Sequence, residues 1–229
     1  MNKVTLSGIM LGALTMVGCG NSAKSPNNDQ AQATTEVAKT DSASKKIVLF
    51  FGDSLTAGYG LDDPADAFPG VISHMVDSLK LPYKVINAGL SGETTAGGNG
   101  RINWLLKQKI DVFVLELGAN DGLRGIPVNE TAKNLQSIVD KVKAKYPDAK
   151  LVLLGMQVPP NMGADYTGKF KTVFPDLAKK NNMALVPFLL QGVGGMPSLN
   201  QSDGIHPTAQ GAKIVANNVW AVLKDELKN

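Results

Sequence analysis

A serine, an aspartate and a histidine in this chain have the residue types and spacing that nucleophilic catalysis needs. Ser54 stands in the stretch "GDSL" at 52–55, and Asp203 and His206 stand in "DGIHP", just before the last helical stretch. Histidine is the usual base near neutral pH, and a carboxylate on its other ring nitrogen fixes the tautomer. The spacing of three residues lets Asp203 reach Nδ1 of His206 from the same loop, which leaves Nε2 for Ser54. We therefore expect Ser54, His206 and Asp203 to form a catalytic triad.

Attack on an ester carbonyl also requires hydrogen-bond donors for the developing oxyanion. The backbone amide of Ser54, at the start of a helix, is one candidate. A second is the amide of Gly89 in "NAGLSG", where the lack of a Cβ permits close approach. The side-chain amide of Asn120 in "GAND" is a third, and it brings no competing negative charge. We expect these three groups to form an oxyanion hole.

Other polar residues near these motifs have simpler explanations. His74 falls inside an apolar-patterned helical stretch, where a surface or packing role is expected, and Ser54 could also serve only as a helix N-cap. Asp53 is expected to accept hydrogen bonds that order the loop, and Asp121 to act as a turn or cap residue. Arg124 could meet an anionic substrate group or lie exposed on its loop.

Several other kinds of site are excluded by spacing. The glycines after the first strand do not fit the dinucleotide fingerprint, and they do not fit the P-loop, which also requires a lysine that is missing. The nucleophile elbow of α/β-hydrolases would need glycine where the chain has Thr56. One loop histidine, no cysteine in the folded body and no H-E-x-x-H motif leave too few ligands for a metal. We expect neither a metal nor a cofactor.

The elements that must position these residues alternate between strands and helices. Short apolar runs rich in Val, Leu and Ile are typical of strands covered on both faces, and they are expected at 46–51, 83–87, 112–117, 151–155 and 184–187. Helical stretches are expected between them and at the end, at 67–80, 99–109, 129–146, 166–181 and 207–228. Serial βα units predict one parallel sheet with helices on both faces, and ligands bind at the carboxyl ends of such strands. The polar and glycine-rich clusters follow the strands and should therefore meet at that edge.

Composition indicates an ordinary globular protein with no affinity for nucleic acid. The chain has 229 residues, of which 43% are hydrophobic and 19% charged, and its formal net charge is +3. No block of Lys and Arg exceeds a pair, and the aromatic content of 6% offers few surfaces for base stacking. After the N-terminus no apolar run is long enough for a membrane-spanning helix.

The N-terminal segment predicts export and a lipid anchor. Residues 1–19 have a basic start, an apolar run and small residues before Cys19, as in a secretory signal peptide. The tetrapeptide at 16–19 resembles a bacterial lipobox, in which the cysteine becomes lipidated; an ordinary cleaved signal peptide is the alternative. Residues 20–45 have almost nothing to bury and are expected to be a disordered tether to a folded domain at 46–229. Gly20 after Cys19 favours the outer membrane or periplasm, by analogy with related lipoproteins.

The four motifs, in this order, resemble the GDSL/SGNH hydrolase family, and the resemblance covers nearly all of 46–228. It implies a flavodoxin-like α/β fold, a three-layer αβα sandwich around a five-stranded parallel sheet. It also implies that Ser54 is the nucleophile, that Gly89 and Asn120 complete the oxyanion hole, and that Asp203 and His206 supply acid and base. The stretches "GDSLTAGYG", "SGETTAGG" and "ELGANDGLRG" look like the bacterial periplasmic thioesterase I, lysophospholipase and arylesterase branch.

The loops after the third and fourth expected strands indicate the class of substrate. These loops carry apolar side chains that favour an acyl chain or an aryl ester over a polyol, namely Leu123, Ile126, Val158, Pro159, Met162 and Tyr166. We expect an exported, monomeric serine esterase that forms an acyl-enzyme from small acyl esters, thioesters or lysophospholipids. Two alternatives remain open: a carbohydrate or peptidoglycan O-acetyl esterase, and a non-catalytic envelope-binding lipoprotein.

Overall fold

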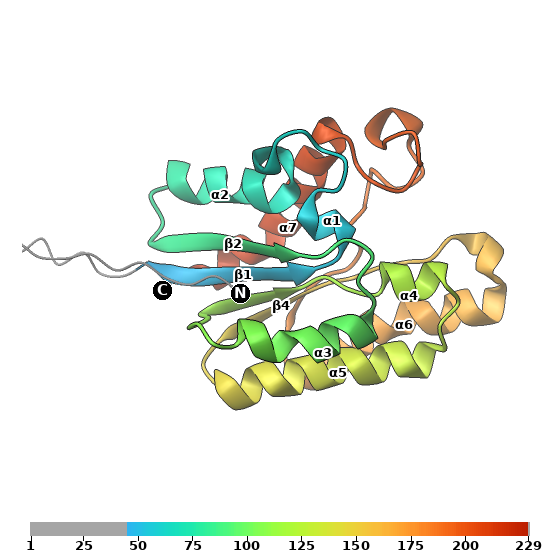
Figure 1. Ribbon diagram of the computed structural model, residues 1–229, viewed down its shortest axis with the longest axis horizontal. Helices are drawn as coiled ribbons and strands as arrows, with labels where there is room; N and C mark the ends of the chain where they lie inside the picture. The colour runs from blue at the N-terminus through green and yellow to red at the C-terminus, as the bar shows by residue number, and fades with distance from the viewer. Residues whose placement is uncertain (1–44, 229) are drawn as a thin grey trace, which may run out of the picture. The chain divides into compact units, whose positions relative to one another are not determined.

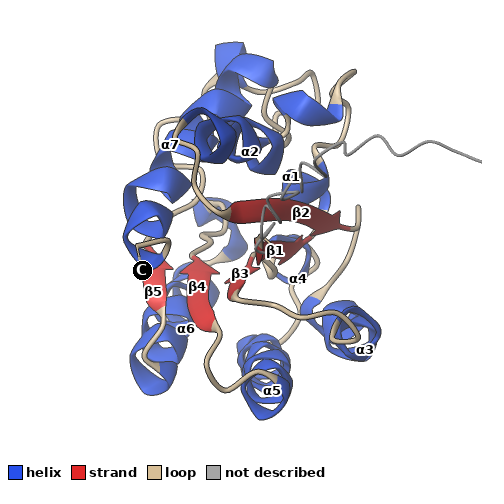
Figure 2. Cartoon of the chain, turned by 90° about the vertical axis from the view of Figure 1, so that its left-hand side faces the viewer, coloured by secondary structure: helices blue, strands red, loops and turns tan. Residues whose placement is uncertain are grey.

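The computed structural model of the protein describes residues 45–228. The predicted signal peptide, Cys19 and nearly all of the predicted tether lie outside the described residues. The described part contains one sheet of parallel strands in the order β2-β1-β3-β4-β5, as Figures 1 and 2 show. In chain order the strands are β1 (Lys46–Gly52), β2 (Tyr83–Gly89), β3 (Val112–Leu115), β4 (Lys150–Leu154) and β5 (Ala184–Val186).

Helices cover both faces of the sheet. The longer helices are α2 (Phe68–Ser78), α3 (Thr95–Leu105), α5 (Val128–Lys145), α6 (Ala164–Asn181) and α7 (Ala209–Glu226). Helices α2 and α7 pack together on one face, and α3, α5 and α6 lie side by side on the other (Figure 2). The predicted three-layer α/β fold with a five-stranded parallel sheet is confirmed.

The central strands form because their side chains are apolar on both faces. Val48, Leu49, Phe50 and Phe51 of β1 are fully buried, as are all four residues of β3 within about one per cent. Such continuous runs fit a parallel sheet that helices cover on both sides, since neither face meets water. The ring of Phe50 meets that of Phe68 edge-on, at 5.6 Å between ring centres, and so ties β1 to α2. The carboxyl end of β1 is thereby held in a rigid core.

Three of the longer helices begin two or more residues away from their predicted starts, and α6 does so at Ala164 instead of residue 166. Helix α3 starts at Thr95 instead of residue 99, because the Thr94 hydroxyl caps it by accepting from the amide of Gly97. Helix α7 starts at Ala209 instead of residue 207, because Thr208 is its N-cap and its hydroxyl accepts from the amide of Gly211. Short helices α1 (Ser54–Ala57) and α4 (Ala119–Leu123) stand at the carboxyl edge. They are too short to give a periodic pattern.

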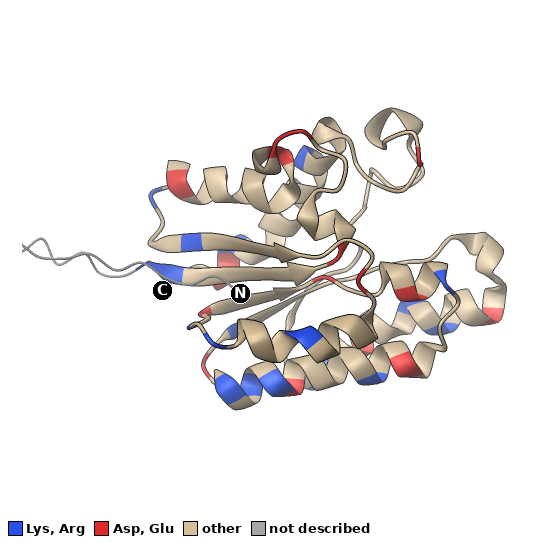
Figure 3. Cartoon of the chain, in the orientation of Figure 1, with Lys and Arg blue, Asp and Glu red and all other residues tan. Residues whose placement is uncertain are grey.

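Charge is distributed unevenly along the strand direction. Basic residues end α5 and α6, at Lys143, Lys145, Lys179 and Lys180. These helix ends point to the amino edge of the sheet, where Figure 3 also shows basic residues at the start of β1 and on β2. Cations at helix C-termini complement the helix dipole, which accounts for this arrangement. None of the helices within residues 45–228 has the length and apolar character needed to cross a membrane.

Candidate active site

The predicted site residues come from loops that follow β1, β2 and β3 and from the loop that precedes α7. Gly52 at the end of β1 is paired in register with Gly89 at the end of β2. Helix α1 begins two residues after β1 and carries Ser54, and α4 follows β3 and carries Asn120. Because the strands are parallel, these loops gather at one edge of the sheet (Figure 1).

Ser54, His206 and Asp203 are linked by hydrogen bonds. The Oγ atom of Ser54 lies 2.8 Å from Nε2 of His206, and Nδ1 of His206 lies 2.6 Å from Oδ2 of Asp203. The other carboxylate oxygen of Asp203 accepts the amides of Ile205 and His206 at 2.9 and 3.0 Å. The hydrogen bond from the His206 ring, aided by these two amides, lowers the pKa of Asp203 to about 2. Asp203 is therefore ionised and orients the imidazole toward Ser54.

The loop that carries His206 is held in place from two sides. The amide of Gln201 donates to the carbonyl of His206 at 2.7 Å, and the Gln201 side chain donates to the carbonyls of Tyr59 and Pro207. Asn200 and Pro207 form an isolated antiparallel bridge. The ring of Tyr59 lies 4.7 Å from the imidazole of His206, measured between ring centres. These contacts fix the imidazole over the start of α1.

The turn that presents Ser54 is ordered by Asp53. The Oδ1 atom of Asp53 accepts the amide of Leu55 at 3.0 Å and so caps α1. Gly58 ends this short helix in the left-handed conformation at φ 77°, which favours glycine. Asp53 is fully buried, and Ser54 is 9% exposed. The expectation that Asp53 orders the loop matches these contacts.

Two of the three predicted oxyanion donors already have partners within the protein. The amide of Gly89 donates to Oδ1 of Asn87 at 2.9 Å. The side-chain nitrogen of Asn120 donates to Oδ2 of Asp53 and to the carbonyl of Glu93, both at 3.1 Å. The amide of Ser54 is at the first turn of α1, where a helix leaves its N–H groups without intrahelical partners. The three groups lie around the start of α1, and donation by Gly89 or Asn120 to an oxyanion requires that existing bonds be shared.

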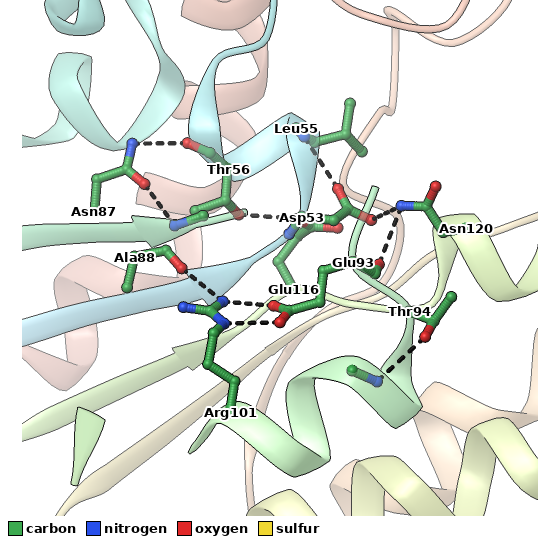
Figure 4. A network of polar contacts seen from close by, with 12 residues as sticks. Asp53, Leu55, Thr56, Asn87, Ala88, Glu93, Thr94, Arg101, Glu116 and Asn120 are labelled. Carbon is green, nitrogen blue, oxygen red and sulfur yellow. Dashed lines mark hydrogen bonds and ion pairs between the residues drawn. The ribbon is translucent and has the colours of Figure 1, made fainter. Parts of the chain in front are cut away.

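Gly89 is required for a reason other than substrate approach. A Cβ at this position would lie 2.2 Å from the amide nitrogen of Ala57, a backbone atom of α1. The missing side chain therefore lets α1 approach the end of β2. The side chain of Asn87 strengthens this contact by donating to the carbonyl of Thr56 at 2.8 Å (Figure 4).

A second carboxyl group lies behind the nucleophile, at a residue that none of the four sequence motifs includes. Glu116 directly follows β3, and its Oε2 atom accepts the amide of Asp53 at 3.1 Å and the hydroxyl of Thr56 at 2.8 Å (Figure 4). Burial raises the pKa of Glu116 well above its usual value, and the charge of Asp53 raises it further. Burial likewise raises the pKa of Asp53, to about 6. The only sequence signal was an acid within the apolar run at 112–117, which was expected to be strand throughout, whereas β3 ends at Leu115.

An ion pair holds the loop after β2. Arg101 of α3 donates to both carboxylate oxygens of Glu93 and to the carbonyl of Ala88 (Figure 4). The Glu93 side chain is almost completely buried, and the guanidinium also lies over the ring of Phe51, 4.4 Å from its centre. The carbonyl of Glu93 is thereby fixed where it accepts from Asn120.

Asp121 is more than a turn or cap residue, and the sequence expectation was wrong. It is fully buried, and its carboxylate accepts the amide and hydroxyl of Thr95 and the hydroxyl of Thr131. Asp121 therefore joins α4 to the starts of α3 and α5. This places Asn120, its neighbour, on an anchored turn. Arg124 donates to the carbonyl of Gly92 and remains exposed.

The residues predicted to bind substrate have different degrees of exposure. Leu123 is 46% exposed, whereas Val158 is 8% exposed and packs beneath the turn at Gly122. Pro159 is exposed and Met162 is partly buried. The hydroxyl of Tyr166 donates to the carbonyl of Ile126 at 2.7 Å and so links the two predicted loops. Within residues 45–228, none of these side chains forms a hydrogen bond with a side chain of the triad.

A small hollow of about 10 Å³ lies beside Ser54 and His206. Its wall includes Ser54 and His206 together with apolar residues, among them Leu55, Tyr59, Leu61, Phe68 and Leu190. It has room for about one water molecule. Within residues 45–228, no three side chains of His, Cys, Asp or Glu lie close enough together to hold a metal ion.

Comparison with known proteins identifies the family. A model of the GDSL-like Lipase/Acylhydrolase family matches residues 50–214. Esterase TesA of Pseudomonas aeruginosa is 40% identical over 189 residues, which are 82% of this chain and 92% of the relative. Thioesterase 1/protease 1/lysophospholipase L1 of Escherichia coli K12 is 37% identical over 176 residues, 76% of this chain and 82% of the relative.

A solved structure of similar sequence has the same fold. It is the psychrotrophic esterase EstA from Pseudoalteromonas sp., inhibited by monoethylphosphonate. That structure is 32% identical, covers 81% of this chain and 100% of its own, and superposes with a TM-score of 0.75. The chain therefore belongs to the GDSL-like Lipase/Acylhydrolase family and is a carboxylic ester hydrolase.

Proposed function

We propose that the protein is an exported serine esterase that hydrolyses acyl esters through an acyl-enzyme. The observation that carries this proposal is the continuous chain of hydrogen bonds from Ser54 through His206 to Asp203, at 2.8 and 2.6 Å. Such a chain allows a base to take the serine proton while a carboxylate stabilises the resulting imidazolium.

In the acylation step, Nε2 of His206 takes the proton of the Ser54 hydroxyl as Oγ attacks the ester carbonyl. Asp203 keeps Nδ1 protonated and stabilises the positive ring, because its lowered pKa of about 2 keeps it ionised. The amide of Ser54, the amide of Gly89 and the side chain of Asn120 donate to the oxyanion of the tetrahedral intermediate. His206 then gives its proton to the leaving oxygen or sulfur, and the acyl group remains on Ser54.

In the deacylation step, the same imidazole takes a proton from water as the water oxygen attacks the acyl carbonyl. The second tetrahedral intermediate collapses, Ser54 recovers its proton from His206, and the carboxylic acid leaves. The residues used in this half-reaction are those of the first half, so no cofactor is needed.

The expected substrates are acyl esters, thioesters and lysophospholipids. Two relatives support this range: one is an esterase, and the other bears the names thioesterase and lysophospholipase. The exposed Leu123 and the partly buried Met162 supply apolar surface on the loops after β3 and β4. We place the acyl chain along these loops and the leaving group beside His206, which must protonate it.

Hydrolysis of p-nitrophenyl esters from acetate to palmitate tests this proposal. We expect rates that peak at one chain length and that vanish in Ser54→Ala and His206→Ala. His74→Ala is the matched control, because His74 is an exposed histidine of α2 and takes no part in the hydrogen bonds that join Ser54, His206 and Asp203. A panel of sugar acetates run beside these esters separates the acyl esterase from a carbohydrate or peptidoglycan O-acetyl esterase. Equal rates in Ser54→Ala and the unaltered protein would overturn the assignment of the nucleophile.

Covalent labelling tests the acyl-enzyme itself. A phosphonate inhibits the relative EstA, and we expect a fluorophosphonate to add one group to Ser54 of this protein. Intact mass should show that addition in the unaltered protein and not in Ser54→Ala. A label on another residue would contradict the proposed mechanism.

We further propose that the protein is a monomer tethered to the bacterial envelope, in the outer membrane or periplasm, by a lipid on Cys19. The proposal is supported by the small residues before Cys19 and by the polar stretch at 20–45. Metabolic labelling with a fatty acid should mark the unaltered chain and not Cys19→Ser, which should also leave the membrane fraction. Labelling of both chains would contradict lipidation at Cys19.

A further inference from the structure

Two acidic residues lie buried behind the nucleophile, and the steps described above use neither. Asp53 is fully buried and Glu116 is 1% exposed. They lie at the carboxyl ends of the neighbouring strands β1 and β3, where Phe51 is paired in register with Leu115. Glu116 directly follows a fully buried apolar run, and Asp53 follows another after Gly52, so both carboxyl groups are held against the core. A buried carboxyl group that nothing neutralises is costly, and its presence therefore calls for an explanation.

The hydrogen bonds of the two groups leave one oxygen atom without a partner. Oδ1 of Asp53 accepts the amide of Leu55, and Oδ2 accepts the side chain of Asn120. Oε2 of Glu116 accepts the amide of Asp53 and the hydroxyl of Thr56. Oε1 of Glu116 is buried and has no hydrogen-bond partner if the group is ionised. If Oε1 carries a proton, it becomes a donor, and Asp53 is the acidic residue whose side chain lies within hydrogen-bonding reach of the Glu116 side chain.

We propose that Asp53 and Glu116 share one proton, held on Oε1 of Glu116, and that this neutral acid positions Asp53 and, through it, the Asn120 amide. In this arrangement every carboxyl oxygen of the pair has a role. Glu116 accepts two hydrogen bonds on Oε2 and donates one from Oε1, and Asp53 remains an acceptor-only group. Glu116 is a positioning residue, because it touches neither the substrate nor Ser54.

The pKa shifts agree with this distribution of charge. A hydrogen bond between the two side chains raises the pKa of Glu116 and lowers that of Asp53, so that the glutamate keeps the proton at a pH where the aspartate has lost it. Two adjacent buried carboxylates cannot both be ionised. The other titratable groups around the pair are His206, which lowers the pKa of Asp53 when its ring is protonated, and Glu93, whose charge is compensated by its ion pair with Arg101.

A single charge on the pair also suits the chemistry beside it. Asn120 is bound to Asp53 and is one of the proposed oxyanion donors, so a second negative charge here would oppose the developing oxyanion. The proton on Glu116 removes that charge. The protonated Glu116 also donates a hydrogen bond to the Asp53 carboxylate, which weakens the hydrogen bond that the carboxylate accepts from Asn120. The Asn120 amide can then also donate to an oxyanion. This inference rests on the proposed esterase mechanism.

The matched substitutions Glu116→Gln and Asp53→Asn test where the proton lies. Both keep the shape of the side chain, and they are made in the full-length chain. Glutamine is neutral and carries a donor where the glutamic acid does, so we expect kcat to fall no more than about tenfold, the effect of altering one hydrogen bond. In Asp53→Asn, an amide group replaces the carboxylate that accepts the hydrogen bond of Asn120. Asn120 is then no longer held in place, so we expect kcat to fall by about 10²–10³, as for a lost oxyanion donor.

Asp111→Asn is the control for both variants. Asp111 lies just before β3, at the opposite end of the strand from Glu116, and accepts the amide of Ile47. It therefore undergoes the same carboxyl-to-amide change far from the site, and kcat should be unaltered. The reverse order, with Asp53→Asn active and Glu116→Gln inactive, would place the proton on Asp53 and overturn the proposal. Equal losses in the two variants would also overturn it.

Infrared difference spectroscopy tests the pair without reference to activity. We expect the carbonyl band of a protonated, buried carboxyl group at neutral pH in the unaltered protein and in Asp111→Asn. The band should be lost in Glu116→Gln. If it remains in Glu116→Gln, the proton is not on Glu116. Because this readout does not require turnover, failure of the proton-sharing pair and failure of the proposed esterase activity give separate results.

Discussion

At the scale of single residues, Asn120 donates hydrogen bonds to two acceptors of the protein before any substrate binds. Both hydrogens of its side-chain nitrogen are used, one by Asp53 and one by the carbonyl of Glu93. A donor held in this way is fixed in direction, so little reorganisation is needed when an oxyanion forms. The same bonds also mean that the amide contributes to local structure. Removing it therefore combines a catalytic effect with a structural one, and the two can be separated by measuring different quantities.

We predict that Asn120→Ala lowers kcat by about 10²–10³ with little change in KM, because the amide acts on the oxyanion more than on the bound ester. Steady-state kinetics on the best p-nitrophenyl ester measures both constants. Asn134→Ala is the control, since Asn134 accepts a hydrogen bond from Asn99 on the outer helices and lies away from the site. A change in KM with unaltered kcat would assign Asn120 to substrate binding instead.

At the scale of elements, the site depends on how closely α1 approaches the end of β2. Gly89 lies against the backbone of α1 at Ala57 and Thr56, so no side chain fits between them. Gly100 provides a contrast, because it lies within α3 and a Cβ there would meet nothing within 4 Å. Replacement of glycine by alanine is therefore expected to lower stability at position 89 and to raise it at position 100.

We predict that Gly89→Ala destabilises the protein by about 1–3 kcal/mol, the usual cost of forcing an extra methyl group into a packed site. It should also lower kcat, because α1 must shift and carries Ser54 with it. Gly100→Ala should raise stability by about 0.4–1 kcal/mol, since it limits the unfolded chain without strain. Urea unfolding and ester hydrolysis measure both effects. Equal stability of the two variants would contradict the role assigned to Gly89.

The sequence predicts elements and local contacts better than contacts between distant segments. Short apolar runs predict all five strands, since such runs are typical of a parallel sheet that helices cover on both faces. The spacing of Asp203 and His206 suffices to predict their contact, because both lie on one short loop. The pairing of Asp53 with Glu116 depends on the register of β1 against β3, which no local pattern encodes. The burial of Asp121 was missed for the same reason, since its partners Thr95 and Thr131 come from two other helices.

At the scale of the whole molecule, the buried pair links the active site to stability against pH. The pKa of Asp53 rises from 3.8 to about 6 on folding, and that of Glu116 rises well above 4.5. A folded state that holds protons more tightly than the unfolded state loses stability as the pH rises. The loss begins near the ordinary pKa values of the two carboxyl groups and continues to their raised values. For Asp53 alone it is on the order of 3 kcal/mol, from about two pKa units.

We predict that the unfolding temperature of the unaltered protein falls as the pH rises from about 4 through about 6, the raised pKa of Asp53, and toward the raised pKa of Glu116, and that Glu116→Gln reduces this fall. The glutamine has no proton to lose, whereas the buried glutamic acid of the unaltered protein must release its proton as the pH rises. One kcal/mol corresponds to about 2–4 °C for a chain of this size, so thermal unfolding monitored by circular dichroism resolves the difference. An equal fall in both proteins would mean that Glu116 ionises normally in the folded state.

The effect of Asp111→Asn on the unfolding temperature should not vary with pH in this way, because folding lowers the pKa of Asp111 and does not raise it. Hydrogen bonding to Ile47 and the charge of Lys109 outweigh partial burial and lower the pKa of Asp111. Its stabilising effect is therefore fully present above the ordinary pKa of 3.8 and is lost only as the pH falls through the lowered value. Removing this carboxylate should lower the unfolding temperature by the same amount at pH 5 and pH 8. The slope between them would then belong to groups whose pKa is raised, and Glu116 is the one whose substitution should flatten it.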